Sequence, residues 1–222
     1  MAQPKLIKTV PGARLYEDDK GNPLLRLDDV RGSYLFLGKQ ADDKNDDGTP
    51  NPKWRGIGML PKARVEAYDL VIATIDKIVA AQGKGEKAVK VLRANMFIQD
   101  GDEREDETMH GHWLISASET KQRPTARNRQ GKEITDATEI DRTFYSGCYL
   151  TMVIRPWFFG GVVKGKDKAY PKRVAASLGS VFFMRDGEPF GAGKIDDSSI
   201  YDDLADGDDG LGGNSNNDGD EI

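Results

Sequence analysis

The sequence contains a single cysteine, Cys148, so no disulfide can form within the chain. One lone cysteine suits a reducing compartment. No apolar run approaches the roughly 20 residues that a bilayer span requires. Residues 1–10 carry lysines but lack the apolar stretch of a secretory signal. These absences argue against disulfide-stapled, exported and membrane-spanning proteins and predict a cytoplasmic location with no membrane partner.

Motifs for catalysis are also missing. There is no Walker-type phosphate loop, no nucleophile elbow and no pair of carboxylates with an accompanying base. Residues 43–48 (Asp-Lys-Asn-Asp-Asp-Gly) copy the opening of a calcium loop, but Trp54 stands where a bidentate Glu belongs, and a flexible acidic loop explains them equally well. His110, His112 and Cys148 lack a fourth ligand and match no zinc spacing. The sequence therefore predicts a protein that is not an enzyme, without catalytic residue, metal or cofactor.

Charge is distributed very unevenly along the chain, whose formal net charge is -5. Residues 195–222 contain ten acidic residues and no lysine or arginine. The preceding 194 residues hold 27 acidic residues against 32 basic ones, a net charge of +5. The chain therefore divides into a basic body and an acidic appendage, and a basic surface suits a polyanionic partner.

The acidic appendage has too few apolar side chains to offset the entropy of ordering it. We therefore predict a disordered tail at residues 195–222. Ile200, Tyr201, Leu204 and Ile222 are apolar residues in this acidic field, which is typical of short segments that dock on partners. A tail that only improves solubility is the alternative.

The body shows mostly the signals of strands. Short apolar, β-branched and aromatic runs, bounded by Gly, Asp and Pro, occur at residues 34–37, 56–60, 92–98, 113–117, 148–157 and 174–184. Only residues 63–81 show apolar residues at helical intervals of three or four. A mainly β fold with one amphipathic helix suits the OB-fold, a five-stranded Greek-key barrel. We expect an N-terminal extension at 1–23 and the barrel domain at 24–194, with long polar loops at 40–53 and 121–141.

Cations and aromatic rings alternate in two segments. A sequence-independent binder of single strands needs cations for the phosphates and rings for the base faces. Residues 52–55 (Pro-Lys-Trp-Arg) and 155–159 (Arg-Pro-Trp-Phe-Phe) supply both types, and residues 122–130 form a basic loop. The candidate contacts to single-stranded DNA are Lys53, Trp54, Arg55, Lys62, Arg64, Trp113, Lys121, Arg123, Arg127, Arg129, Trp157, Phe158, Lys164, Lys166, Lys172 and Arg173.

Burial is the competing explanation for the rings. Trp54 has charged neighbours on both sides, which favours exposure. Trp113 lies within a strand run, where a place in the core and a place on the surface are equally consistent with its neighbours. Trp157 and Phe158 follow a proline near a strand end, where packing at the barrel mouth is an alternative to stacking on bases.

Five segments together resemble the tailed-phage single-stranded DNA-binding proteins. They are residues 51–54 (Asn-Pro-Lys-Trp), 58–62 (Gly-Met-Leu-Pro-Lys), 99–103 (Gln-Asp-Gly-Asp-Glu), 144–149 (Phe-Tyr-Ser-Gly-Cys-Tyr) and 185–191 (Arg-Asp-Gly-Glu-Pro-Phe-Gly). The resemblance spans about residues 24–193. It implies an OB-fold, sequence-independent binding of single strands, and a role in phage DNA replication, recombination and repair in the cytoplasm of the infected bacterial host.

The resemblance also implies that the acidic tail contacts replication or recombination proteins, although this tail ends in Ile222 where such tails commonly end in an aromatic residue. From the charge division we expect the tail to compete with DNA for the basic surface. The tail residues assigned to this role are Asp202, Asp203, Asp206, Asp208, Asp209, Asp220, Glu221 and Ile222. A phage scaffold module, a metal-dependent nuclease and a preference for RNA or for duplex are the alternatives.

Overall fold

The computed structural model describes residues 3–45, 48–82, 96–164, 168–170 and 172–191. Two units are distinguished along the chain, Met1–Phe190 and Gly191–Ile222. The helices and strands described all lie in the first unit. Residues 192–222, which include the predicted tail, lie outside the described residues, so the division into 1–23, 24–194 and 195–222 stays a prediction.

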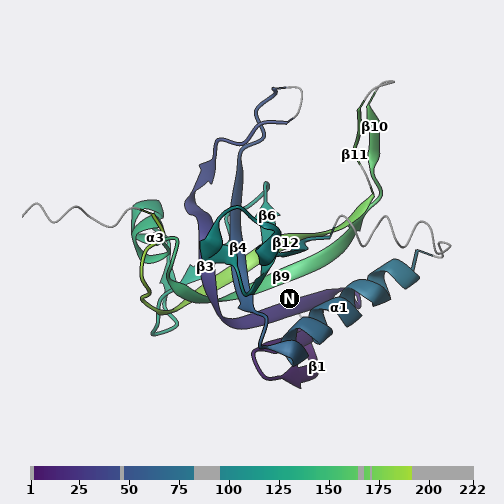
Figure 1. The fold of residues 1–222 in the computed structure, drawn as a ribbon, viewed down its shortest axis with the longest axis horizontal. Helices are drawn as coiled ribbons and strands as arrows, with labels where there is room; N and C mark the ends of the chain where they lie inside the picture. The colour runs from purple at the N-terminus through teal and green to yellow at the C-terminus, as the bar shows by residue number, and fades with distance from the viewer. Residues whose placement is uncertain (1–2, 46–47, 83–95, 165–167, 171, 192–222) are drawn as a thin grey trace, which may run out of the picture. The chain divides into compact units, whose positions relative to one another are not determined.

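The described secondary structure is mostly β, as predicted (Figure 1). The strands are β1 (Lys5–Val10), β2 (Ala13–Glu17), β3 (Pro23–Ala41), β4 (Lys53–Pro61), β5 (Ile98–Asp100), β6 (His112–Glu119), β7 (Thr125–Arg127), β8 (Glu133–Ile134), β9 (Tyr149–Phe159), β10 (Val162–Lys164), β11 (Lys168–Tyr170) and β12 (Arg173–Arg185). The helices are α1 (Val65–Ala80) and α3 (Ala137–Thr143), with 3-10 turns η1 (Gly101–Glu103) and η2 (Glu107–Met109).

The main sheet closes into a barrel. Its strands are hydrogen bonded in the order β5-β6-β4-β3-β9-β12-β7-β8, and the pairs from β6 to β12 are antiparallel. Phe97 closes the ring, since its N–H donates to the Val174 carbonyl of β12 at 3.1 Å and its carbonyl accepts from the Ser116 N–H of β6 at 2.8 Å. The predicted OB-fold is confirmed.

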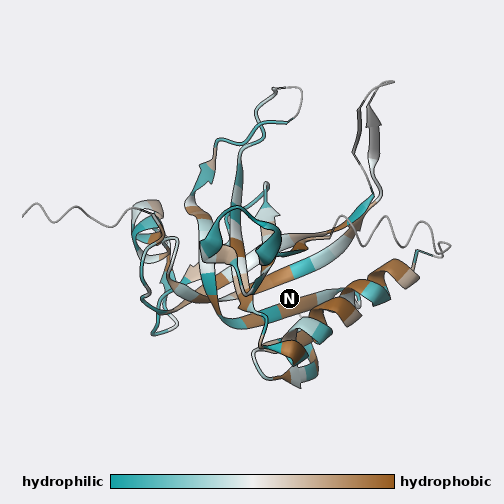
Figure 2. Ribbon diagram, in the orientation of Figure 1, coloured by the Kyte–Doolittle hydropathy of each residue, from teal (hydrophilic) through white to brown (hydrophobic). Residues whose placement is uncertain are grey.

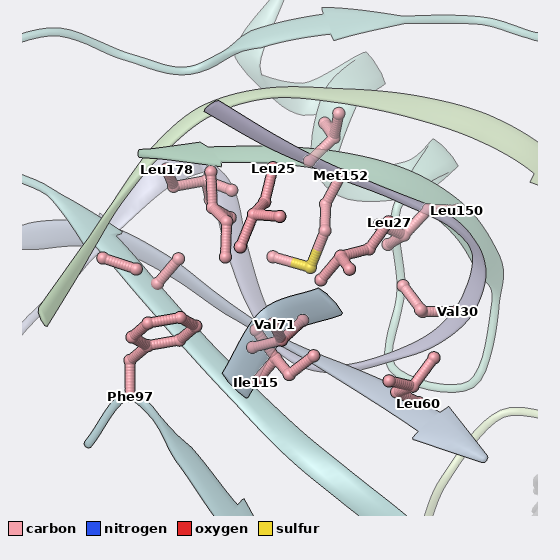
Figure 3. Packing of buried hydrophobic residues seen from close by; sticks show 14 of the residues in the cluster. Leu25, Leu27, Val30, Leu60, Val71, Phe97, Ile115, Leu150, Met152 and Leu178 are labelled. Atoms are coloured by element: carbon pink, nitrogen blue, oxygen red, sulfur yellow. The ribbon is translucent and has the colours of Figure 1, made fainter. Parts of the chain in front are cut away.

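The barrel interior is filled by alternate residues of the long strands, because successive side chains of a strand point to opposite faces. Leu25 and Leu27 of β3 meet Met152 of β9 in this core, and Val71 of α1 packs onto it (Figure 3). At Gly58 of β4 a Cβ would lie 2.4 Å from Met152 Sδ, so this strand can approach β9 only without a side chain there. Even-numbered positions of β4 therefore face inward, and odd-numbered positions face outward.

Helix α1 confirms the helix predicted at residues 63–81. Its buried residues recur at helical spacing and are Ala67, Leu70, Val71, Thr74, Ile75 and Val79. Figure 2 shows this alternation as brown patches along the otherwise mixed surface of the helix. Helix α1 thereby covers part of the barrel core. No helix in the described part of the chain has the length and apolarity needed to cross a membrane.

The structure adds elements to the predicted set. Within residues 1–23, β1 and β2 form a hairpin around Gly12, which has a φ of +80°, and β2 pairs with β3. The loop predicted at residues 121–141 contains β7, β8 and the short helix α3. Of the strand predicted at residues 92–98, residues 92–95 lie outside the described residues and β5 begins at Ile98. The other predicted strands lie within β3, β4, β6, β9 and β12.

Candidate nucleic-acid interface

A bulge in β3 presents two aromatic rings on the outer face of the barrel. The register with β4 shifts between Ser33 and Phe36, and Tyr34 takes a left-handed conformation with a φ of 49°. Tyr34 is 48% exposed and Phe36 is 37% exposed. A tyrosine in this region of backbone space is strained, so the flanking strand pairing must hold it there. The result is a pair of rings that solvent, and therefore a ligand, can reach.

Two cations of β4 lie beside these rings. Phe36 is directly opposite Arg55, and directly opposed residues share one face of a sheet. The Arg55 guanidinium lies 4.8 Å from the centroid of the Phe36 ring, within the range of a cation–π contact. Lys53, two residues earlier, points to the same outer face. Both cations also form ion pairs with the carboxylate of Asp43, at 3.4 Å from Lys53 and 3.1 Å from Arg55.

A second combination of cation and rings lies where β9 and β12 meet. Arg173 is opposite Phe159, and its guanidinium lies 5.2 Å from the ring centroid. Trp157, opposite Ala175, contacts Phe159 edge to face with ring centroids 5.9 Å apart. Trp157 is 41% exposed. Its outward position agrees with strand alternation, since Trp157 and Phe159 are two residues apart.

A pocket of about 290 Å³ lies between the cations of β4 and Arg173 of β12, whereas Trp157 lines a different pocket beside α1. The lining of the first pocket includes Tyr34, Lys53 and Arg55 on one side and Arg173 and Ala175 on the other. Figure 1 shows the loop between β3 and β4 and the β10–β11 hairpin extending from the same side of the barrel, at the top of the view. We call this surface the outer track and define it by Tyr34, Phe36, Lys53, Arg55, Trp157, Phe159 and Arg173. Among the described residues, the large aromatic side chains that are exposed are Tyr34, Phe36 and Trp157. Tyr34 lines the pocket, Phe36 lies under Arg55, and Trp157 packs against Phe159.

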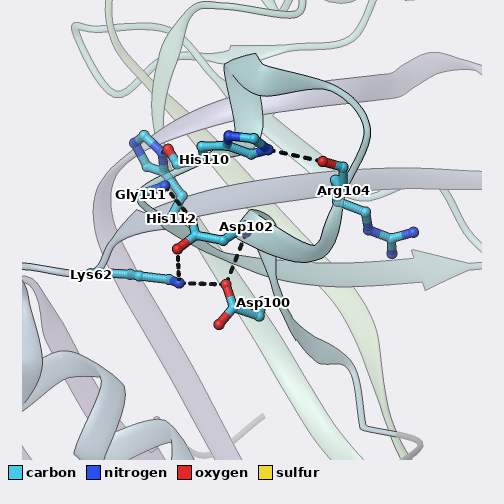
Figure 4. A network of polar contacts seen from close by, with 7 residues as sticks. All are labelled: Lys62, Asp100, Asp102, Arg104, His110, Gly111 and His112. Atoms are coloured by element: carbon cyan, nitrogen blue, oxygen red, sulfur yellow. Dashed lines mark hydrogen bonds and ion pairs between the residues drawn. The ribbon is translucent and has the colours of Figure 1, made fainter.

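The other end of β4 also carries a lysine close to an aromatic ring, but there the lysine is paired with two carboxylates (Figure 4). Lys62 Nζ lies 2.5 Å from Asp100 and 2.7 Å from Asp102, and 4.8 Å above the Trp113 ring. Trp113 in turn stacks on Tyr68 of α1 with centroids 4.4 Å apart. The hydrogen bonds between Lys62 and the two carboxylates raise the pKa of Lys62 and lower the pKa values of Asp100 and Asp102. These contacts attach η1 and α1 to the barrel.

Arg64 has structural partners as well. Its guanidinium donates to the Asp28 carbonyl at 2.5 Å and to the Asp29 carboxylate at 3.4 Å. Lys62 and Arg64 follow β4, whereas Lys53 begins it, and a strand of this length spans about 26 Å at 3.3 Å per residue. The structure therefore does not bring Lys62, Arg64 or Trp113 to the outer track.

The predicted basic loop lies along another part of β12. Its cations are Lys121, Arg123, Arg127 and Arg129. Arg123 donates to the Thr135 carbonyl at 2.6 Å, and Arg127 lies 3.7 Å from the Glu133 carboxylate. Strand β7 pairs with β12 at Ser180–Phe182, about 23 Å along the strand from Arg173 at 3.3 Å per residue. Lys121 and Arg129 are exposed.

The remaining predicted contacts differ in position: some face inward, some are exposed, and one lies outside the described residues. Trp54 lies between Lys53 and Arg55 but on the inward side of β4, half-buried, with its indole N–H 3.5 Å from the Gly38 carbonyl. Phe158 lies on the inward side of β9, opposite Val174. Lys172 is exposed immediately before β12. Lys164 ends β10, and Lys166 lies outside the described residues. Lys53, Arg55 and Arg173 are thus the predicted residues that line one pocket, and Trp157 adjoins Arg173 through Phe159.

Sequence reasoning missed three rings of the outer track: Tyr34, Phe36 and Phe159. In residues 34–37 (Tyr-Leu-Phe-Leu) both faces of the strand read as apolar, so the pattern does not say which face is outside. In residues 155–159 strand alternation predicts the missed ring. Trp157 and Phe159 must share one face of the strand, and Phe158 must lie on the other.

The residues weighed as metal ligands do not gather. Cys148 is fully buried, and burial raises its pKa to about 12, so its thiol stays protonated at neutral pH. His110 hydrogen bonds to the Arg104 carbonyl, and His112 to the His110 carbonyl. Within the described ranges, no group of three or more His, Cys, Asp or Glu side chains could hold a metal ion.

An OB barrel whose outer face carries exposed rings between cations defines the class of oligonucleotide-binding OB-fold domains. A family model described as the ssDNA-binding protein of Enterobacter phage Enc34 matches residues 25–211. The chain belongs to this family of phage single-stranded DNA-binding proteins, which confirms the resemblance seen in its motifs.

Individual relatives agree with this assignment. The single-stranded DNA-binding protein from bacteriophage Enc34 is 32% identical, with a TM-score of 0.68 over 90% of this chain and 100% of that one. Its structure in complex with ssDNA is 31% identical, with a TM-score of 0.70 over 86% of this chain and 100% of that one. Protein p50 of Acyrthosiphon pisum secondary endosymbiont phage 1 is 30% identical over 159 residues, which are 69% of this chain and 80% of the relative.

Proposed function

We propose that the protein binds single-stranded DNA along the outer track, without sequence preference and without catalysis. The observation that supports this most strongly is that the exposed large rings each have a cation nearby: Tyr34 shares a pocket with Lys53, Arg55 and Arg173, Phe36 lies under Arg55, and Trp157 packs against Phe159, which carries Arg173. Stacking on a ring contributes on the order of 1 to 3 kcal/mol per base and tolerates any base, because every base has a π face. Family membership and the ssDNA complex of the Enc34 protein support the same ligand.

In this proposal Lys53, Arg55 and Arg173 contact phosphates. Each phosphate neutralised on a single strand releases counterions and contributes about -0.7 to the slope of log Kobs against log salt concentration. Three such contacts contribute about -2. Lys121, Arg129 and Lys172 are exposed and lie off the pocket, and in this proposal they extend the path of the strand.

The direct test is an anisotropy titration of labelled oligodeoxythymidine against a duplex of equal length over a series of salt concentrations. A strand of about 16 nucleotides or more covers one OB site. We expect the single strand to bind more tightly than the duplex, with a clearly negative salt slope. An oligouridine arm tests RNA preference, and plasmid incubated with magnesium, manganese or calcium tests nuclease activity. Absence of single-strand binding at moderate salt would favour a scaffold module instead.

We further propose that residues 195–222 act as a tail that covers the outer track and recruits replication or recombination proteins when DNA displaces it. The support is the segregation of charge, with ten acidic residues in the tail and a net charge of +5 in residues 1–194. Opposite charges attract over a Debye length of about 8 to 10 Å at ordinary salt. The role would belong to phage DNA replication, recombination and repair in the cytoplasm of the infected host.

Removal of residues 195–222 should tighten single-strand binding, most strongly at low salt. The matched control keeps the full length and changes the tail Asp and Glu residues to Asn and Gln, which removes the charge alone. Equal gains in the two variants support electrostatic competition. Unchanged affinity in both variants would contradict it.

A further inference from the structure

The loop after β3 places a carboxylate between the two β4 cations of the outer track. One oxygen, Asp43 Oδ2, lies 3.4 Å from Lys53 Nζ and 3.1 Å from Arg55 Nε. The backbone of this residue is held in place, since the Asp43 carbonyl accepts from the Asn51 N–H at 2.7 Å. Asp43 therefore contacts both cations from a fixed point at the base of the loop.

The contact is an ion pair without an aligned hydrogen bond. Asp43 Oδ2 and Arg55 Nε are both shielded from solvent, and neither atom has a hydrogen-bond partner. An ion pair that lacks an aligned hydrogen bond stabilises its two partners less than one that has it. An anion that could align with the guanidinium would be held more strongly, because charged hydrogen bonds are about twice as strong as neutral ones when well aligned.

A phosphodiester is such an anion. It carries one negative charge on two non-bridging oxygens, so it can accept from the ammonium of Lys53 and from the guanidinium of Arg55 at once. Phe36, under the Arg55 guanidinium at 4.8 Å, places a ring beside the same point, where a base attached to that phosphate could stack. The two cations outnumber the single carboxylate, so the site keeps an attraction for one more negative charge.

We infer that Lys53 and Arg55 form a phosphate subsite of the outer track and that the Asp43 carboxylate occupies this subsite until a DNA phosphate displaces it. This inference rests on the proposed function and names one subsite within it. Displacement is a rotation of a short side chain that needs no backbone movement. Because the carboxylate competes for the subsite, a free phosphate gains little there, whereas a polynucleotide is also held by its stacked bases. Asp43 thus favours long strands over isolated anions.

The test compares two full-length variants, Asp43→Asn and Asp42→Asn. Both remove one negative charge from the same loop, but Asp42 is an exposed neighbour and Asp43 is the residue in the subsite. We expect Asp43→Asn to bind oligodeoxythymidine about two to five times more tightly at low salt, as expected for a partly exposed ion pair. Its salt slope should be steeper by up to about 0.7, since no carboxylate must be set free. Asp42→Asn should change affinity less than twofold.

Two results would overturn the inference. If Asp43→Asn binds equally well or more weakly, Asp43 holds the cations in position and does not compete with phosphate. If both variants tighten binding equally, the gain in affinity comes from the lower negative charge of the loop as a whole. In an Arg55→Gln background the gain from Asp43→Asn should disappear, and a persisting gain would count against the subsite.

A second readout separates this inference from the proposed function. Inorganic pyrophosphate is titrated into the wild type and Asp43→Asn while the NMR signal of the Arg55 Nε–H group is followed. The subsite predicts a shift of this signal at lower pyrophosphate concentration in Asp43→Asn than in the wild type. If no variant binds DNA but this difference is found, the proposed function fails and the subsite stands. If the difference is absent, the subsite is refuted whatever the DNA result.

Discussion

The two ends of β4 carry the same residue types with opposite consequences. At the start of the strand, Lys53 and Arg55 face outward beside exposed rings and a pocket. At its end, Lys62 is paired with two carboxylates over Trp113, whose other face is covered by Tyr68. The difference lies in the partners that the fold supplies. Cations and rings stay accessible at the start of β4, whereas a helix and a loop cover them at its end.

The largest expected difference between the two ends of β4 is the loss of stability when Trp113 is removed. Trp113→Ala removes a large ring stacked on Tyr68 and beneath Lys62, and should lower the free energy of unfolding by about 3 kcal/mol. Urea denaturation measures this loss, and the affinity of the folded fraction for single strands should hardly change.

Trp157→Ala is the matched control for that experiment. Trp157 is 41% exposed on the outer track, so its removal should leave the thermal midpoint almost unchanged and lower affinity by one stack, about 1 to 3 kcal/mol. If Trp113→Ala instead weakens binding tenfold while stability is retained, the two ends of β4 do not differ as we describe.

Next in size is the loss of both cations at the start of β4. Lys53→Ala with Arg55→Ala should weaken single-strand binding by about 150-fold at low salt, since each of the two charge-assisted hydrogen bonds contributes roughly 1.5 kcal/mol. The salt slope should become shallower by about 1.4 for two lost phosphate contacts. Lys62→Met removes a cation from the other end and serves as the control, with affinity expected within a factor of two of the wild type.

A smaller change in affinity should distinguish the inward from the outward rings at the start of β4. Phe36→Ala should weaken binding about tenfold for one lost stack, and Phe36→Tyr should preserve it. Trp54→Ala should act mainly on stability, because Trp54 lies on the inward side of the strand. A loss of affinity in Trp54→Ala at unchanged thermal midpoint would instead support the stacking role predicted from its charged neighbours.

The smallest expected effect is the pH dependence of the stability that the ion pairs of Lys62 contribute. Hydrogen bonds from Lys62 lower the folded-state pKa values of Asp100 and Asp102, so their contribution to stability is present above the unfolded pKa of about 3.9. It is lost as the pH falls through the lower folded-state values. Thermal denaturation should therefore show that Asp102→Asn is slightly less stable than the wild type at pH 7, and that the difference vanishes in strong acid. A difference independent of pH would contradict the ion pairs.

The sequence predicted the elements whose pattern is local. Helix α1 follows from apolar residues at intervals of three and four, and the long strands follow from their β-branched and aromatic runs. The hairpin of β1 and β2 went unrecognised although Pro11 and Gly12 mark its turn, because its strands are short and mostly exposed on β1.

The site was only partly predictable because it depends on contacts between distant segments. The cover on Trp113 comes from Tyr68, 45 positions earlier, and the meeting of Arg55 with Arg173 at one pocket depends on closure of the barrel. Nothing in the neighbours of Trp113 or Arg173 encodes these contacts. Tyr34 and Phe36 could not be separated from core residues, because the bulge that turns them outward is a feature of pairing with β4.

At Tyr34, the left-handed backbone lowers the stability of the fold but exposes an aromatic ring to solvent. A non-glycine residue at a φ of 49° costs on the order of 1 to 3 kcal/mol, which glycine would avoid. A chain optimised for folding alone would place glycine there. The tyrosine at this position therefore keeps a ring exposed to solvent at a cost in stability. Under the proposed function, Tyr34→Gly should make the fold more stable and weaken the binding of single strands.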